Sequence, residues 1–260
     1  MSGEVLRADE PGGVAIVTLS NAPRLNAMTR AMWRALRQVF LDLQADPTVR
    51  CVLLRGSGGH FCAGGDIAEY PAFRFDPESL LDFHEGDVWG GLQAMLDCDV
   101  PMIAAIGGHC MGAGVELACC CDLRVASESA RFGAPIARLG FPMAPRELAL
   151  VVRVAGEASA RQLLLEAAVL EAADLQARGF LHGVVPAHEL AEHALARARG
   201  MAALAPQAAR LNKQALRALA SREATEATLL AIVAQAYRYA DSPEHREGIE
   251  AFLAKRPARF

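Results

Sequence analysis

Residues 101–122, PMIAAIGGHCMGAGVELACCCD, contain a short apolar run, a glycine-rich turn and a longer apolar segment in succession. The run 102–106 lies between a proline and a pair of glycines, a pattern that is typical of a buried strand. Residues 115–121 are apolar except at Glu116, so the helix that they predict is expected to be buried on all sides. This stretch therefore indicates the centre of a core that contains both strands and helices.

Glu116 is a carboxylate in the first turn of this apolar helix. A buried charge is costly unless it is paired, hydrogen-bonded or neutralised. One interpretation is a structural carboxylate that the helix N-terminus stabilises. The other is a catalytic acid or base, because buried carboxylates with shifted pKa values gather at functional sites. The stretch alone leaves both open.

Strands and helices alternate on both sides of this stretch. Further strands are expected at residues 14–19, 51–54, 123–126 and 184–186. Helices are expected at 29–43, with Thr29 as N-cap, and at 80–96, 146–155, 160–166 and 170–178. We expect residues 71–77 to form a loop over a pocket and residues 130–145 to be irregular. The pattern predicts an α/β core over residues 1–190 and an α-helical C-terminal region over 191–260.

Composition excludes several classes of function. The chain has 260 residues, of which 53% are hydrophobic, enough for a packed core. Its 26 basic and 30 acidic residues give a formal charge of −4, which argues against binding to nucleic acid or to an anionic membrane. We see no secretory leader and no apolar run long enough to span a bilayer.

Cysteine usage indicates the compartment. The seven cysteines are an odd number, and three are consecutive at 119–121, which does not suit a disulfide framework. We expect small core residues in a reducing, cytoplasmic environment. A metal site of 119–121 with His109 is the alternative, but the paired spacings of zinc sites are absent, so no metal is expected.

Two glycine-rich turns share one design. Residues 61–66, FCAGGD, and 111–114, MGAG, each follow a predicted strand and lead into a helix. Small residues let a ligand approach the backbone, and the first N–H groups of a helix are free. Two such N–H groups aimed at one point would stabilise an oxyanion. The alternative is that both segments merely turn the chain. Neither is a phosphate loop or a serine nucleophile elbow.

Five collinear segments resemble the crotonase family, also called the enoyl-CoA hydratase/isomerase family. They cover nearly the whole chain and are NAPRLNAM at 21–28, HFCAGGDI at 60–67, PMIAAIGGHCMGAGVELACCCDLRVAS at 101–127, RFGAPIARLGFP at 131–142 and REGIEAFLAKR at 246–256. The resemblance implies a spiral of ββα units with a helical C-terminal region used in trimerisation. It therefore implies a homotrimer or a dimer of trimers.

The resemblance also implies a chemistry. The substrate would be an acyl-CoA thioester, with no cofactor beyond the coenzyme A of the substrate itself. The thioester carbonyl would lie between the backbone N–H groups of Gly65 and Ala113, and Glu116 would be the main catalytic acid or base. The residues expected to contact substrate or CoA are Arg24, Leu25, Ala63, Gly64, Asp66, Ile67, Gly112 and Ile136. Those expected along the acyl pocket are Phe73, Phe75, Phe83 and Trp89.

One position departs from the hydratase pattern. Enoyl-CoA hydratases carry a second glutamate where this chain has Ile136. Hydration uses one group to activate water and another to deliver a proton, and isoleucine does neither. Glu147 is the candidate substitute, although an acid that only stabilises its helix N-terminus is the more ordinary interpretation. His60, His84 and His109 are expected to be structural or on the surface, and contact of His109 with the site is the less favoured alternative.

We therefore expect an enzyme of the enoyl-CoA hydratase/isomerase type in fatty-acid or related acyl-CoA metabolism. The alternatives are a catalytically weakened acyl-CoA-binding protein, and another enolate-type reaction such as decarboxylation, because a fold does not fix the reaction.

Overall fold

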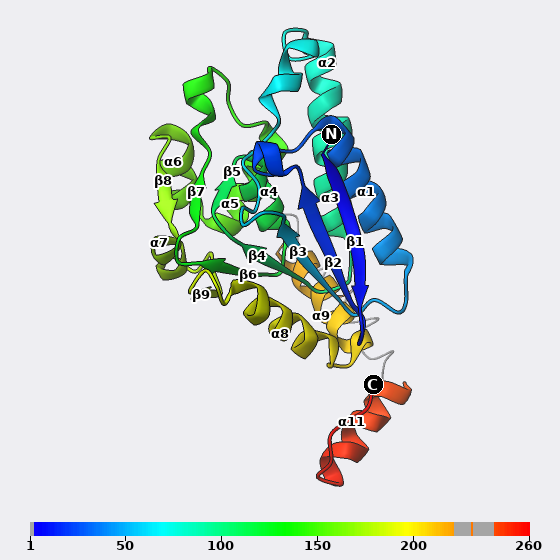
Figure 1. Ribbon diagram of the computed structural model, residues 1–260. Coiled ribbons are helices and arrows are strands. Elements are labelled where there is room, and N and C mark those ends of the chain that lie inside the picture. The colour runs from blue at the N-terminus through cyan, green and yellow to red at the C-terminus, as the bar shows by residue number, and fades with distance from the viewer. Residues whose placement is uncertain (1–2, 221–229, 231–241) are drawn as a thin grey trace.

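The protein is described by a computed structural model that covers residues 3–220, 230 and 242–260. Within these residues the strands form one six-stranded sheet, in the order β1-β2-β3-β4-β6-β9, and one three-stranded sheet, in the order β5-β7-β8 (Figure 1). The strands of the large sheet are β1 (Glu4–Glu10), β2 (Val14–Ser20), β3 (Cys51–Gly56), β4 (Met102–Ile106), β6 (Leu123–Ser127) and β9 (Gly183–Val185). Those of the small sheet are β5 (His109–Met111), β7 (Arg131–Gly133) and β8 (Val169–Glu171).

Pairing in the large sheet is parallel from β2 to β9, and only β1 runs antiparallel to its neighbour. A strand of the large sheet is followed by a strand of the small sheet and then by a helix, as in β4, β5 and α4 (Ala113–Cys120). The next pair, β6 and β7, extends both sheets in the same direction. This repetition is the predicted spiral of ββα units.

Helices cover both faces of the large sheet because its side chains alternate in direction. Ala15, Val17 and Leu19 of β2 pack into the core that contains α1 (Arg30–Ala45) and α3 (Trp89–Asp97). Val14 and Ile16 pack on the other face with alanines of α8 (Leu190–Ala202). Helix α8 thus belongs to the packed core, although it lies in the region expected to serve trimerisation.

The remaining helical segments differ from expectation in two places. The predicted helix 80–96 is three segments, which are α2 (Pro77–Leu81), a π-helical stretch (Asp82–Val88) and α3. The predicted helix 170–178 is shorter, because its first residues form β8 and α7 covers only Ala172–Ala177. Strands β1, β5, β7 and β8 were not predicted, since β5, β7 and β8 are three residues long and show no readable period.

Other elements match the expected positions. Thr29 caps α1, where its hydroxyl accepts a hydrogen bond from the Met32 N–H at 3.1 Å. The helices that follow the small sheet are α5 (Pro145–Ala155) and α6 (Glu157–Leu165), and 3-10 turns occupy Ala22–Arg24, Ile67–Ala72 and Pro135–Leu139. The last helices are α9 (Pro206–Leu219) and α11 (Pro243–Leu253), and α11 projects beyond the sheets in Figure 1. Part of the predicted helical region, 221–229 and 231–241, lies outside the described residues.

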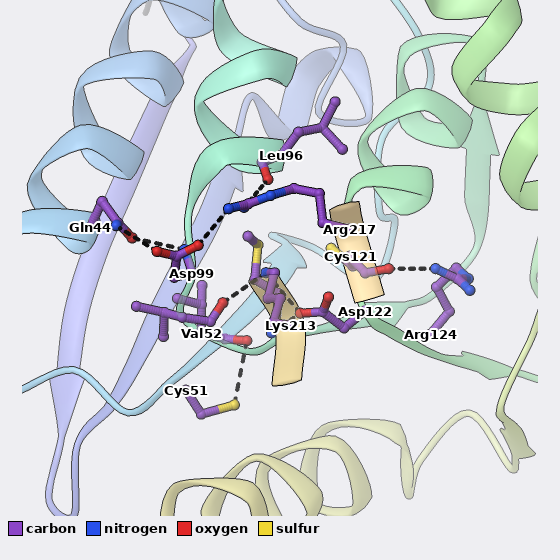
Figure 2. A network of polar contacts seen from close by, with 12 residues as sticks. Gln44, Cys51, Val52, Leu96, Asp99, Cys121, Asp122, Arg124, Lys213 and Arg217 are labelled. Atoms are coloured by element: carbon purple, nitrogen blue, oxygen red, sulfur yellow. Dashed lines mark hydrogen bonds and ion pairs between the residues drawn. The ribbon is translucent and has the colours of Figure 1, made fainter. Parts of the chain in front are cut away.

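A polar network attaches α9 to the core (Figure 2). The Asp99 carboxylate accepts hydrogen bonds from Gln44, Gln214 and Arg217 at 2.7–3.1 Å. Lys213 Nζ lies 2.9 Å from both the Val100 carbonyl oxygen and Asp122 Oδ2. Burial alone would raise the pKa of Asp99, but its hydrogen bonds outweigh burial and lower it.

Among the described residues no helix combines the length and apolar character that crossing a membrane requires. A cytoplasmic location stays a prediction.

Candidate active site

A cavity of about 400 Å³ opens between the two glycine-rich turns. It contains both glutamates that the sequence singled out, Glu116 and Glu147, together with Ile136. The other predicted residues on its wall are Leu25, Ala63, Gly64, Gly65, Ile67, Gly112 and Ala113. A larger, mainly apolar groove of about 880 Å³ adjoins the cavity, but neither Glu116 nor Glu147 lines it. The groove and the cavity share Ile136, Phe141, Pro142 and Met143. The candidate chemistry therefore lies in the smaller cavity.

Short strand-like pairings bring the two turns together. The Cys62 N–H donates to the His109 carbonyl at 2.9 Å, and the Met111 N–H donates to the Cys62 carbonyl at 2.8 Å. Gly64 and Gly112 then lie side by side, with φ angles of +113° and +46° that L side chains rarely adopt. A side chain at either glycine would strain its turn.

The backbone N–H groups of Gly65 and Ala113 are the two donors that the family resemblance implied for the thioester carbonyl. Gly65 forms a parallel bridge with Met28. In this bridge the Met28 N–H donates to the Gly64 carbonyl at 2.8 Å, and the Asp66 N–H donates to the Met28 carbonyl at 2.9 Å. The Gly65 N–H therefore points to the other side. Ala113 is the first residue of α4 and has no acceptor within its helix. No turn or loop hydrogen bond among the described residues uses either N–H as a donor.

Glu116 lies in the first turn of α4 and is 9% exposed. Its carboxylate has no hydrogen-bond partner among the described residues, and it faces the cavity. Burial raises the pKa of Glu116 to about 8, and the nearby charge of Glu147 adds to the rise. A carboxyl that the protein neither pairs nor hydrogen-bonds does not fit the structural interpretation of Glu116.

Glu147 lies in the first turn of α5 and is 2% exposed. Its Oε1 lies 3.1 Å from Nδ1 of His84, which also lines the cavity. His84 belongs to the π-helical stretch, and such irregular turns are frequent at functional sites. The more ordinary interpretation of Glu147, an acid that only stabilises its helix, does not account for a buried side chain on the cavity wall.

Some predicted residues lie off the cavity. Neither Arg24 nor Asp66 lines the wall. Arg24 ends an exposed 3-10 turn, and the Asp66 carboxylate accepts a hydrogen bond from the Ala68 N–H at 3.1 Å. Of the expected aromatic residues only Phe83 lines the cavity, whereas Phe75 is 85% exposed. Phe73 packs behind Phe83 with ring centroids 4.4 Å apart, and Trp89 is not on the wall.

The sequence did not identify several residues of the wall. They are Trp33, Tyr70, Arg74, His84 and Phe141. His84 was expected to be structural or on the surface, because it has no partner at a telling spacing in the sequence. His109 also lines the wall, which was the less favoured of its two interpretations. His60 remains structural in character, since its ring stacks on His109 with centroids 4.9 Å apart. Tyr70 lies five residues after Gly65, in the 3-10 turn that follows the glycine-rich turn. This closeness in the sequence was the local signal that could have indicated a place for Tyr70 near the site.

The described residues contain no group of three or more His, Cys, Asp or Glu side chains that could hold a metal ion. The cysteines of the described core are reduced and buried, and burial raises the pKa of Cys119 and Cys121 to about 12. They pack as small apolar residues.

Comparison with known proteins identifies the family. The family model for enoyl-CoA hydratase/isomerase matches residues 9–260. The chain belongs to the enoyl-CoA hydratase/isomerase family. The predicted family and its fold are thereby confirmed.

Relatives and solved structures agree with this assignment. A probable enoyl-CoA hydratase of Rhizobium meliloti is 34% identical over 261 residues, which is 100% of this chain and 99% of that protein. The 2,3-dehydroadipyl-CoA hydratase of Escherichia coli is 34% identical and covers 95% of this chain and 94% of its own. The crystal structure of an enoyl-CoA hydratase/carnithine racemase from Magnetospirillum magneticum superposes with a TM-score of 0.92 at 36% identity, covering 98% and 94% of the two chains.

Proposed function

We propose that this chain is an enoyl-CoA hydratase that adds water across the double bond of a 2-enoyl-CoA thioester. The observation that carries the proposal is the presence of Glu116 and Glu147 on the wall of one cavity, beside two free N–H groups. Relatives that are named enoyl-CoA hydratases support the reaction class.

The thioester oxygen binds between the N–H groups of Gly65 and Ala113. Negative charge grows on this oxygen when water attacks the β-carbon, and two preorganised donors stabilise it. The acyl-CoA then lies along Leu25, Ala63, Gly64, Ile67 and Gly112, with Ile136 against the acyl group. Arg24 and Asp66 lie outside the cavity and would contact only the more distant parts of the CoA.

The environments of the two glutamates suggest their roles. Glu116 has a raised pKa of about 8 and is mainly protonated at neutral pH, so it is the proton donor. Glu147 is held by His84 and takes a proton from water. The oxygen of water bonds to the β-carbon and the proton of Glu116 goes to the α-carbon. Glu116 is left ionised and Glu147 protonated, and exchange with solvent restores both.

A second reaction is isomerisation of the double bond. Ile136 makes part of the wall apolar, and one carboxyl group, Glu116, suffices to move a proton between the α- and γ-carbons. This reaction needs no water in the cavity. Loss of Glu147 would therefore impair it less than hydration.

Assembly into a homotrimer or a dimer of trimers remains part of the proposal. Apolar side chains are exposed on the last helices, among them Leu216 of α9 at 69% and Leu253 of α11 at 74%. Exposed apolar groups of this size favour burial against a partner. Light scattering that gave the mass of a monomer at micromolar concentration would contradict it.

The test of function is a panel of 2-enoyl-, 3-enoyl- and 3-hydroxyacyl-CoA thioesters in deuterium oxide, followed by mass spectrometry. Hydration incorporates the oxygen of water and one solvent deuteron, whereas isomerisation conserves mass except for exchanged deuterons. Tight binding without any turnover would instead indicate a protein that only sequesters thioesters.

A further inference from the structure

Tyr70 is a cavity residue to which the mechanism above gives no role. It lies in the 3-10 turn Ile67–Ala72, just beyond the glycine-rich turn that supplies Gly65. Its ring meets Phe73, Phe83 and Phe141 edge-on, with centroids 5.8–6.4 Å apart. The guanidinium carbon of Arg74 lies 4.6 Å from the ring centroid. These neighbours fix the ring and leave its hydroxyl at one defined place.

That place is beside Gly65. A Cβ atom built on Gly65 would overlap the Tyr70 hydroxyl, so the oxygen rests directly against the backbone of this residue. The hydroxyl has no hydrogen-bond partner among the described residues. Every fully enclosed N or O atom of the described side chains has a hydrogen-bond partner. The Tyr70 oxygen has none, so it is not fully enclosed and is open to the cavity that Tyr70 lines. Buried tyrosine hydroxyls usually have a partner, and here the partner must come from a ligand or solvent.

We propose that Tyr70 Oη donates a hydrogen bond to the thioester oxygen of bound acyl-CoA, as a third donor beside the N–H groups of Gly65 and Ala113. This inference rests on the proposed function, because it assigns a further catalytic residue to the same oxyanion site. It explains why the residue beside the turn carries a hydroxyl, whereas its ring contacts alone need only a phenylalanine.

The surroundings keep the hydroxyl a donor. Burial raises the pKa of Tyr70, so the phenol stays protonated at neutral and mildly basic pH. The positive charge of Arg74 over the ring acts in the opposite direction and makes the O–H more polar, which strengthens the hydrogen bond that it donates. Arg74 has no carboxylate partner among the described residues, so this charge is not neutralised locally.

The test is Tyr70→Phe, which removes one oxygen and keeps every ring contact. Cinnamoyl-CoA is the probe, because its absorbance shifts to the red when its thioester carbonyl is polarised. We expect a clear red shift with the wild type, a smaller shift with Y70F, and a kcat lower by about 10²-fold with little change in KM. Tyr70→Leu, which also removes the ring, should raise KM as well.

The outcomes separate the two proposals. Without a red shift or turnover in the wild type, the oxyanion site itself is wrong and the proposed function fails. If the wild type polarises the probe and turns over while Y70F matches it in both, Tyr70 only packs and this inference is overturned. If Y70F does not fold by circular dichroism, 2,3-difluorotyrosine at position 70 replaces it. Its lower phenol pKa should then bring the loss of activity to lower pH, and an unmoved pH profile would overturn the inference.

Discussion

Nδ1 of His84 lies 3.1 Å from Oε1 of Glu147, and this contact joins residues that are 63 positions apart in the chain. It holds a buried carboxylate at the cavity in which Glu116 also lies. A second carboxylate on the cavity wall thus comes from the first turn of α5, whereas Ile136, at the position where the sequence resemblance implied a glutamate in hydratases, gives the wall an apolar side chain.

Glu147→Gln should abolish most hydration without unfolding the protein. The amide can still contact His84, but it cannot take a proton from water, and such groups contribute about 10²–10⁴-fold. Proton exchange at the α-carbon through Glu116 should survive better. Hydration is measured by the loss of enoyl-thioester absorbance, and exchange by mass spectrometry in deuterium oxide. Glu157→Gln, on the exposed surface of α6, is the control. Hydration by E147Q at the wild-type rate would return Glu147 to a structural role.

Ile136→Glu should restore part of the hydration that E147Q loses. Ile136 lines the same cavity, so a carboxylate at this position can activate water or deliver a proton to the substrate in place of Glu147. A lower melting temperature is expected, because the new acid has no partner at a partly buried site. The matched control is Ile136→Gln in the E147Q background, which adds polarity without a titratable proton. Equal hydration rates in the two double variants would show that a carboxylate at position 136 does not take part in hydration.

The value of kcat/KM should fall above a pH of about 8. Glu116 has its pKa raised to about 8 by burial and by Glu147, and the proposed mechanism needs its proton. Because kcat/KM reports the free enzyme, its alkaline limb should follow this group. A profile that keeps rising through pH 9 would instead make Glu116 the base.

Glu116→Gln should lower activity by about 10²–10⁴-fold. Its stability relative to the wild type should increase as the pH rises. The folded protein holds this proton up to a pKa of about 8, whereas the unfolded chain releases it near 4.5. The free energy of unfolding of the wild type therefore decreases between these values, by at most about 1.4 kcal/mol per pH unit. Glutamine does not titrate, so the advantage of E116Q in urea unfolding should be near zero at pH 4.5 and largest at pH 8. A constant difference between the two pH values would contradict the raised pKa.

Asp99→Ala should destabilise the attachment of α9. The change removes the acceptor of hydrogen bonds from Gln44, Gln214 and Arg217, and charged hydrogen bonds of this kind contribute about 1.5–3 kcal/mol. The pKa of Asp99 is lowered in the folded protein, so its contribution is complete above the unfolded pKa and is lost as the pH falls through the folded one. Urea unfolding at pH 7 measures the difference.

The control for Asp99→Ala is Glu157→Ala. This change breaks an exposed pair with Arg161, in which both side chains are about two-thirds exposed. Such pairs contribute roughly 0–1 kcal/mol. Equal losses in D99A and E157A would show that the network in Figure 2 contributes no more than a surface contact.

Local chemistry was sufficient to predict much of the framework. Neighbouring residues alone predict the strand β4 and the Thr29 cap of α1. They also predict the glycine-rich turns that contain Gly65 and precede Ala113. Together with the family motifs they placed Glu116 at the start of a buried helix, and the structure has it there.

What the sequence could not decide depends on residues that are distant along the chain. The short strands β5, β7 and β8 exist because each finds a neighbour to pair with, and three residues carry too little periodicity to predict that. Glu147 and His84 lie on different helices, and no local spacing relates them. The hydroxyl of Tyr70 reaches Gly65 because its ring packs against Phe73, which ends the same 3-10 turn, and against Phe83 and Phe141 from two other segments. The sequence was sufficient to predict the family and its fold, since these depend on motifs of neighbouring residues, and to place Glu116 in the first turn of a buried helix. The tertiary structure decided that Glu147 and the Tyr70 hydroxyl share the cavity with Glu116, because only packing brings side chains that are distant along the chain to one cavity wall.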